Sequence, residues 1–166
     1  MSAGKHRRRR AVTAALLPTA LLTAALLTAG PAAADTADTA AFDAAIAATR
    51  AAAGCPALVA DPLAQRAAEL SNRSTADYLD HRAEYVPVDD PLAVLHDLGS
   101  DAAAAVQLQG AADTAADAIE VALLQGYATL PDCGYQRLGT SVIEHPGGQT
   151  LVVAVLIGGP GPATAG

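Results

Sequence analysis

The sequence predicts an α+β domain, and three observations support this fold class. Two Asp-Pro pairs, at 61–62 and 90–91, each open a run with apolar residues at helical spacing. Two β-rich runs, 135–145 and 149–157, follow later and are joined through Pro-Gly-Gly, as in an antiparallel hairpin. The second run is apolar throughout, which indicates a central strand covered on both faces. Helices followed by a C-terminal hairpin favour a sheet layered with helices.

Start and stop signals place the individual helices. The first is expected from about Ala40 to Ala53, after a polar leader at 34–40, with Phe42, Ile46 and Ala53 on one face and Gly54 at its end. Three further helices are expected, from Asp61 towards His81, from Asp90 to before Gly99, and from the cap Asp113 to before Gly126. The apolar face of the second helix is expected to comprise Leu63, Ala67, Leu70, Thr75 and Tyr78. Residues 102–110 are expected to form a strand.

The N-terminus has the layout of a secretory signal peptide. A cationic start, MSAGKHRRRR, precedes the apolar stretch AVTAALLPTALLTAALLTAG and small residues at Ala32 and Ala34. We therefore expect a signal peptide at 1–34, cleaved after Ala34, with no stable membrane anchor afterwards. An uncleaved anchor is the alternative, because the apolar stretch is long enough to span a bilayer. The arginine run leaves Sec and twin-arginine export both open.

Cleavage after Ala34 leaves a strongly acidic chain of 132 residues. Five arginines and no lysine then remain against 17 acidic residues, a net charge of −12. Such a surface repels phosphate backbones and anionic head groups, which excludes nucleic-acid binding. The length fits one domain, at 35–157, followed by a flexible tail at 158–166. An acidic, alanine-rich and lysine-free exported chain is typical of high-GC actinobacterial sequences.

The chain contains two cysteines, Cys55 and Cys133, which are 78 residues apart. In an oxidising compartment, a single pair is interpreted most simply as one disulfide. The alternative is a reactive thiol or a metal pair, but neither a CxxC spacing nor a set of neighbouring histidines accompanies them. We therefore expect a Cys55–Cys133 disulfide that ties the turn after the first helix to the loop before the hairpin.

The order of motifs resembles the CAP superfamily of cysteine-rich secretory, antigen 5 and pathogenesis-related-1 (SCP-like) domains. The segment ATRAAAGCPALVADPLAQRAAEL resembles the opening helix, the elbow and the second helix of that family. TADYLDH, PLAVLHDLG, AVQLQG and DTAADAIEVALLQG resemble, in this order, its next four segments. DCGYQRLGTSVIE and QTLVVAVLI resemble its closing strands. The resemblance covers about residues 40–157 and implies an α-β-α sandwich of a degenerate, small secreted type.

In this family two histidines and two glutamates line a cleft that can hold a divalent metal. The resemblance matches the first histidine with His81 and, in a loose register, one glutamate with Glu120. The other glutamate has no match, because residues 106–107 are Val-Gln, and the second histidine falls at Gly126 or Tyr127. Because zinc needs three or four protein ligands, the resemblance implies a scaffold without the metal centre and without another cofactor.

The resemblance implies a secreted or cell-envelope, non-enzymatic domain. It would bind a lipid or other small apolar ligand, or a cell-envelope protein, with His81 and Tyr127 as candidate ligand-binding residues. One alternative is a secreted hydrolase of peptides or cell wall that uses His81 and a carboxylate such as Glu120. A second is a structural or antigenic protein without a ligand. Asp80, His81 and Glu84 could form an acid/base cluster, although a solvated helix end explains them more simply.

Overall fold

The computed structural model describes residues 31–159, with side chains from residue 36 onward. In chain order the elements are α1 Pro31–Ala52, β1 Val59–Ala60, α2 Pro62–Leu79, α3 Pro91–Asp97, β2 Ala104–Ala112, α4 Ala115–Gln125, β3 Tyr135–His145 and β4 Gln149–Gly158. Residues 1–30 of the predicted signal peptide and 160–166 of the predicted tail lie outside the described residues. Within the described range, no helix has the length and apolar character needed to cross a membrane.

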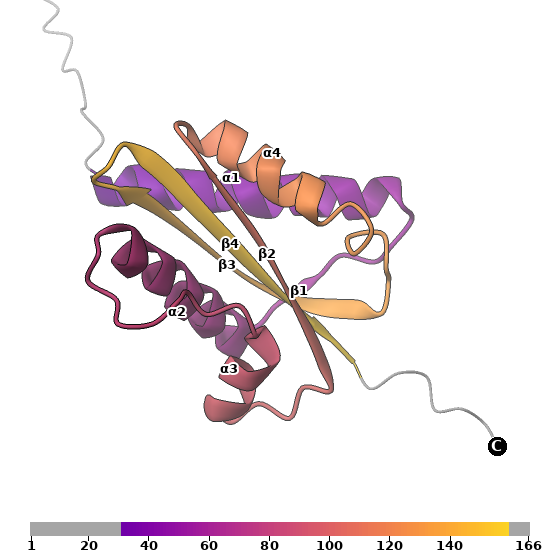
Figure 1. Cartoon of the computed structure of the whole chain (residues 1–166). Coiled ribbons are helices and arrows are strands. Elements are labelled where there is room, and N and C mark those ends of the chain that lie inside the picture. The colour runs from indigo at the N-terminus through magenta and orange to yellow at the C-terminus, as the bar shows by residue number, and fades with distance from the viewer. Residues whose placement is uncertain (1–30, 160–166) are drawn as a thin grey trace, which may run out of the picture.

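The sheet has the strand order β1-β3-β4-β2 (Figure 1). β3 and β4 form the predicted antiparallel hairpin, and β2 pairs antiparallel with the other edge of β4. The two-residue strand β1, which the sequence pattern does not predict, lies parallel to β3. Every residue of β4 from Thr150 to Gly158 is buried, which confirms the prediction of a central strand covered on both faces.

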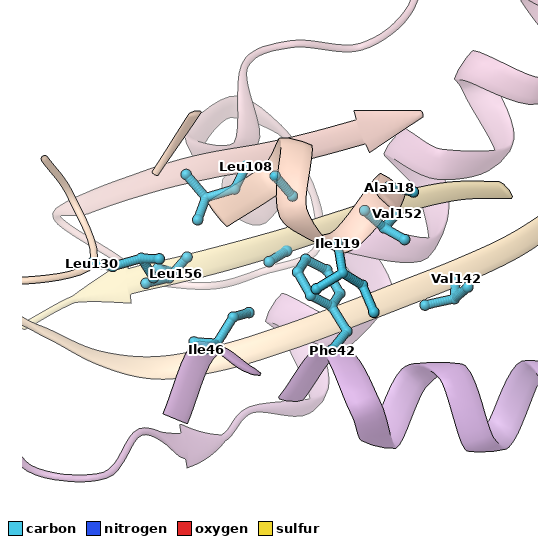
Figure 2. Close-up of a cluster of buried hydrophobic side chains, with 11 residues drawn as sticks. Phe42, Ile46, Leu108, Ala118, Ile119, Leu130, Val142, Val152 and Leu156 are labelled. Carbon is cyan, nitrogen blue, oxygen red and sulfur yellow. The ribbon is translucent and has the colours of Figure 1, made fainter. Parts of the chain in front are cut away.

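Helices cover both faces of the sheet, as expected for an α-β-α sandwich. α1 and α4 lie on one face, and α2 and α3 lie on the other (Figure 1). The side chains of β4 alternate between the two layers. Val152, Ala154 and Leu156 join the core on the α1 and α4 side, and Val153, Val155 and Ile157 join the core on the α2 and α3 side. Figure 2 shows the first of these cores, with Phe42 and Ile46 from α1 and Ile119 from α4.

Two glycines let helices approach the sheet backbone closely. A Cβ atom at Gly139 of β3 would clash with the backbone of Ala64 and Gln65 in α2. A Cβ atom at Gly110 of β2 would clash with the carbonyl oxygen of Ala118 in α4. α2 and α4 therefore lie directly on the sheet, and their side chains are brought within reach of the strand edges.

The helix caps confirm two predictions and correct two others. Asp61 and Asp90 cap α2 and α3 as expected, each accepting hydrogen bonds from two backbone N–H groups of the first turn. α4 is capped by Thr114 rather than Asp113, because the Thr114 Oγ1 accepts the hydrogen bond from the N–H three residues later. α1 begins at Pro31 rather than near Ala40, since the alanine-rich segment predicted as a polar leader continues the helix.

The buried helix faces also differ from the predicted ones. Phe42 and Ile46 are buried as expected, but Ala53 lies beyond the end of α1 and is exposed. Arg50, four residues after Ile46, takes the third buried position of α1. In α2, Tyr78 is 48% exposed instead of packing on the sheet. The buried face of α2 comprises Ala64, Ala67, Ala68, Ser71 and Asn72.

The Cys55–Cys133 disulfide is present, with a Cα–Cα distance of 5.2 Å. It joins the turn after α1 to the loop before β3, which confirms the pairing predicted from the sequence. Arg50 fastens the same loop from inside, because the residue is 1% exposed and its guanidinium donates two hydrogen bonds to loop carbonyls and one to the carbonyl of the first residue of β3. The acceptors are Leu130 O at 3.0 Å, Asp132 O at 3.1 Å and Tyr135 O at 2.8 Å.

Asp61 links the start of α2 to β3. Its Oδ1 accepts from Leu63 N and Ala64 N, both at 2.9 Å, and its Oδ2 lies 2.9 Å from Arg137 Nη1. Desolvation raises the pKa of Asp61, but the hydrogen bonds from Ala64 and Leu63 and the Arg137 charge outweigh it, so the pKa is lowered. The ionised carboxylate therefore stabilises the folded state.

We expect Asp61→Asn to lower the free energy of unfolding at pH 7 by about 1 kcal/mol, because the cap is kept and the ion pair is lost. The pKa of Asp61 is lower in the folded state. Its contribution is therefore present above the unfolded pKa of about 3.9 and is lost as pH falls through the folded pKa. Urea unfolding between pH 7 and pH 2 should show the free energies of unfolding of the unaltered protein and the variant converging in acid.

Asp90→Asn is the control, because Asp90 caps α3 without an ion pair to arginine among the described residues. Its free energy of unfolding at pH 7 should fall by less than that of Asp61→Asn. An unchanged Asp61→Asn deficit at the lowest pH would contradict this assignment.

Candidate functional site

A cavity of about 400 Å³ lies where α2, β2 and β4 meet at the edge of the sheet. We call it the α2–β2 cavity. Its walls include Asn72 and Thr75 of α2, Gln109 of β2, Val121 of α4, and Leu151 and Val153 of β4. Its volume is within the range of sites that hold small organic molecules. None of its lining residues carries an ionisable side chain.

Asn72 is the buried polar residue of this cavity. Its side chain is 0% exposed, and its Nδ2 donates to Ser141 O at 3.1 Å, Ser141 Oγ at 3.1 Å and Leu151 O at 3.0 Å. Its Oδ1 has no hydrogen-bond partner among the described residues. A buried acceptor left without a donor costs about 1–3 kcal/mol.

A chain of uncharged polar side chains runs from α2 across β2 beside this cavity. Ser71 Oγ donates to Gln107 Oε1 at 2.7 Å, and Gln107 Nε2 donates to Gln109 Oε1 at 3.2 Å. The edge N–H of Gln109 donates to Gln125 Oε1 from the end of α4 at 2.6 Å. Gln125 thus covers one backbone donor of an edge strand and ties α4 to β2.

The rest of the cavity wall is apolar. Val121, Leu151 and Val153 contribute aliphatic surface, and Pro87 closes one side from the loop after α2. The Thr75 hydroxyl donates to Ser71 O at 3.2 Å inside its own helix. No histidine or carboxylate lies in the wall to activate that hydroxyl. The arrangement therefore favours binding by apolar contact and hydrogen bonding over acid–base chemistry.

The three site residues expected from the resemblance do not line this cavity. His81 follows the C-terminal end of α2 with a φ of 56° and is exposed. Glu120 is an exposed residue of α4, on the other side of the sheet from α2. Tyr127 is 76% exposed in the turn after α4. None of the three lines the α2–β2 cavity or any of the three other main pockets of the described residues.

The charged residues at the end of α2 form a different cluster from the one considered above. Asp80 Oδ1 lies 3.0 Å from Nε2 of His145, whose side chain is only 8% exposed although it stands next to the hairpin turn. Asp80 Oδ2 lies 2.6 Å from Arg82 Nη1. The hydrogen bond that Arg82 donates to Asp77, followed by the charge of Asp80, raises the pKa of Arg82. Asp80 therefore bridges the end of α2 to the hairpin, which is a structural role.

A second, more open groove of about 730 Å³ lies between α2, the loop at 82–88 and α3. Tyr85 and Val86 at its rim are 76% and 75% exposed. Its walls carry both signs of charge, including Arg73, Asp77 and Asp97. Because no buried polar group without a partner in the described chain lies in these walls, the α2–β2 cavity is the better candidate for a specific site.

The residues present do not fit the divalent metal of the resembled family. Within residues 31–159, no group of three or more His, Cys, Asp or Glu side chains could hold a metal ion. At the α2–β2 cavity the polar side chains are amides and a hydroxyl, which are weaker metal ligands than imidazole or carboxylate.

Sequence reasoning missed Asn72, Gln109 and Gln125. One signal for Asn72 was available, because polar residues 71–72 follow Ala67 and Ala68 at the spacing of a buried helix face. A polar residue on such a face needs partners inside the fold. Gln109 stands two positions from Gln107 in a strand, so the two share a face, but the sequence does not indicate what that face meets.

Comparison of the fold with solved structures identifies its type. No family model matches the sequence, and no curated protein matches it significantly. A cysteine-rich secretory protein from Staphylococcus aureus superposes with a TM-score of 0.60 at 12% identity, over 75% of this chain and 39% of that one. An outer surface protein from Borrelia burgdorferi gives 0.61 at 10% identity, over 75% and 94%. An extracellular SCP-domain protein from Bacillus anthracis gives 0.53 at 18% identity, over 79% and 44%.

These similarities show that the chain has a CAP-like (SCP-like) α-β-α fold, as the order of motifs predicted. The chain spans less than half the length of the Staphylococcus and Bacillus proteins and nearly all of the Borrelia protein. At 10–18% identity the similarity concerns the fold alone. The function has to be argued from the site.

Proposed function

We propose that this protein is a secreted or cell-envelope CAP-like domain that binds a small, mainly apolar molecule in the α2–β2 cavity and catalyses no reaction. The observation that carries the proposal is a cavity of about 400 Å³ with aliphatic walls and no ionisable lining residue. An apolar ligand gains free energy there by leaving water, while polyanions are repelled by the net charge of −12 that is expected after signal cleavage.

Three further observations support a location outside the cytoplasm. The first 34 residues have the pattern of a signal peptide, and the two cysteines form a disulfide of the kind that persists in oxidising compartments. The structural neighbours are described as secretory, outer-surface and extracellular proteins. The hydrolase alternative has less support, because His81 is exposed and lies outside the cavity walls.

Filling the cavity should weaken ligand binding strongly without unfolding the protein. Val121 is 44% exposed and lines the cavity, so Val121→Trp narrows it from the solvent side. The fluorescence of N-phenyl-1-naphthylamine, a neutral apolar probe, should rise saturably with the unaltered domain, and the variant should bind it at least tenfold more weakly. Leu124→Trp, at a position of α4 that is 64% exposed and outside the cavity wall, is the matched control and should bind normally.

Two outcomes would overturn this proposal. Absence of saturable binding to the unaltered domain would favour the structural or antigenic alternative. Equal loss of binding in Val121→Trp and Leu124→Trp would place the probe somewhere other than the α2–β2 cavity. Mass spectrometry of the natively isolated protein provides an independent check, because a co-purified lipid or other apolar compound should be absent from Val121→Trp.

A further inference from the structure

Strand β2 forms an unprotected edge of the sheet. It is the last strand in the order β1-β3-β4-β2, and it pairs with β4 along its whole length without a register shift. Edge strands of soluble proteins are usually short, bulged, or interrupted by charged residues or proline. Residues 102–112 contain neither a charged residue nor a proline. β2 therefore has the length, the regularity and the uncharged surface that allow a further strand to pair with it.

The main-chain groups of β2 alternate in direction. The N–H of Gln109 donates to the side chain of Gln125 and not to β4, so the main chain of Gln109 faces away from the sheet. In an antiparallel ladder, the N–H and C=O groups of Ala105, Gln107 and Ala111 then face the same way. None of these three N–H groups donates to a loop or a side chain of the described residues. A strand beside β2 would find these three donors available and a fourth one under Gln125.

The opposite edge of the sheet, which belongs to β3, is protected. β1 pairs with β3 at Arg137 and Leu138, and Asp61 N donates to Leu138 O at 2.9 Å. Further along the same edge, Thr140 N donates to Gln65 Oε1 of α2 at 3.1 Å. Of the two edges of the described sheet, β2 is therefore the one that is left accessible to another chain.

The surroundings of β2 define the charge of its partner. Residues 83–136, which include α3, β2 and α4, contain nine acidic residues and no lysine or arginine. Asp101 and Asp113 stand shortly before and directly after β2, and both are exposed. A second copy of this acidic chain would be repelled here. Lysine or arginine side chains at the two ends of an extended peptide would instead meet opposite charge.

We infer that β2 binds an extended, basic segment of another protein, with apolar or β-branched residues in its centre and lysine or arginine at its ends. The segment adds a fifth strand to the sheet and exchanges main-chain hydrogen bonds with Ala105, Gln107 and Ala111. Apolar side chains of its centre can pack on Val121, which is 44% exposed and lines the same cavity as Ala111. This inference goes beyond the proposed function, because it concerns main-chain pairing at the outer edge of β2.

NMR titration of the isotope-labelled domain with the acetylated and amidated peptide KKTVTVTVKK tests this inference. The amide protons of Ala105, Gln107 and Ala111 should shift downfield saturably, because each gains a hydrogen bond. Two matched peptides are the controls. EETVTVTVEE has the same centre with acidic ends and should bind about tenfold more weakly. KKPPPPPPKK keeps the charge but has no N–H group in its centre, so it should leave the three amides unshifted.

Two variants of the protein locate the peptide. Gln125→Ala uncovers the N–H of Gln109 and should bind KKTVTVTVKK about threefold more tightly, whereas Leu124→Ala, at the neighbouring position, should bind it like the unaltered domain. Ala105→Pro removes one outward donor, which an edge strand tolerates, and should bind about fivefold more weakly. Circular dichroism shows whether the variants fold, and Gln125→Ala, which leaves β2 unchanged, carries the test if Ala105→Pro does not.

Three results would overturn the inference. Equal binding of KKTVTVTVKK and KKPPPPPPKK would show attraction between charges without strand pairing. Unchanged binding in Gln125→Ala would place the peptide away from β2. A concentration-dependent dimer of the peptide-free domain in sedimentation equilibrium, with exchange broadening at Ala105, Gln107 and Ala111, would assign the edge to a second copy of this chain instead.

Discussion

Removing the Cys55–Cys133 disulfide should lower the free energy of unfolding by about 4 kcal/mol. The bond closes a loop with a sequence separation of 78, and the loss of chain entropy in the unfolded state grows with the length of that loop. An effect of this size is a large fraction of the stability of a domain of this length. The expected result is a large shift of the urea midpoint in the double variant Cys55→Ser/Cys133→Ser.

Reduction of the unaltered protein provides the matched comparison. The reduced protein and the double serine variant should unfold at nearly the same urea concentration, because both lack the same constraint. Circular dichroism at low denaturant should show that both retain the native helix and sheet content, since the disulfide lies at one end of the sandwich. A loss below about 1 kcal/mol would contradict the role assigned to the bond and would indicate that Arg50 alone holds the loop.

Much of the fold could be predicted because its signals are local. The Asp-Pro starts of α2 and α3 each depend on two adjacent residues, and the hairpin depends on two β-rich runs around one turn. The apolar run of β4 indicates burial on both faces by itself. β1 was missed because two exposed residues carry no pattern and pair only with a distant strand.

The candidate site could not be predicted to the same extent, because contacts between distant segments create it. Asn72 is buried where α2 packs on β3 and β4, and its amide there meets the backbone of Ser141 and Leu151. Gln125 reaches the N–H of Gln109 only through the way that α4 packs beside β2. The resemblance directed attention to His81 and Tyr127, which are both exposed in this chain. Hydrophobic periodicity and helix or strand propensity describe single elements, and they do not specify which distant segments contact one another.

Arg50 should be the second major stabilising residue. Hydrogen bonds from a charged donor contribute more than neutral ones, and three backbone carbonyls between residues 130 and 135 accept from this guanidinium. Burial lowers the pKa of Arg50, against the opposing charge of Asp132, so desolvation of the guanidinium offsets part of the stabilisation by these hydrogen bonds. We expect Arg50→Ala to reduce the free energy of unfolding by about 3 kcal/mol net, measured by urea unfolding.

Two variants sharpen the test of Arg50. Arg66→Ala removes a helix arginine that is 53% exposed and pairs with Glu69 at 3.3 Å, so it should cost less than about 0.5 kcal/mol. Arg50→Lys keeps the charge but replaces the planar fork by a shorter point donor, so it should recover only part of the stability. Equal stability of Arg50→Ala and Arg66→Ala would rule out the proposed clamp.

The disulfide and Arg50 fasten the same loop, so their effects should not add. With Cys133 tethered to Cys55, the carbonyls released by Arg50→Ala stay close to the helix end and are poorly hydrated. Without the disulfide, the loop can move towards solvent, and water then replaces the lost hydrogen bonds. In a double-mutant cycle, Arg50→Ala should therefore cost at least about 1 kcal/mol less in the Cys55→Ser/Cys133→Ser background. Additive losses in the free energy of unfolding would show that the disulfide and Arg50 stabilise the loop independently.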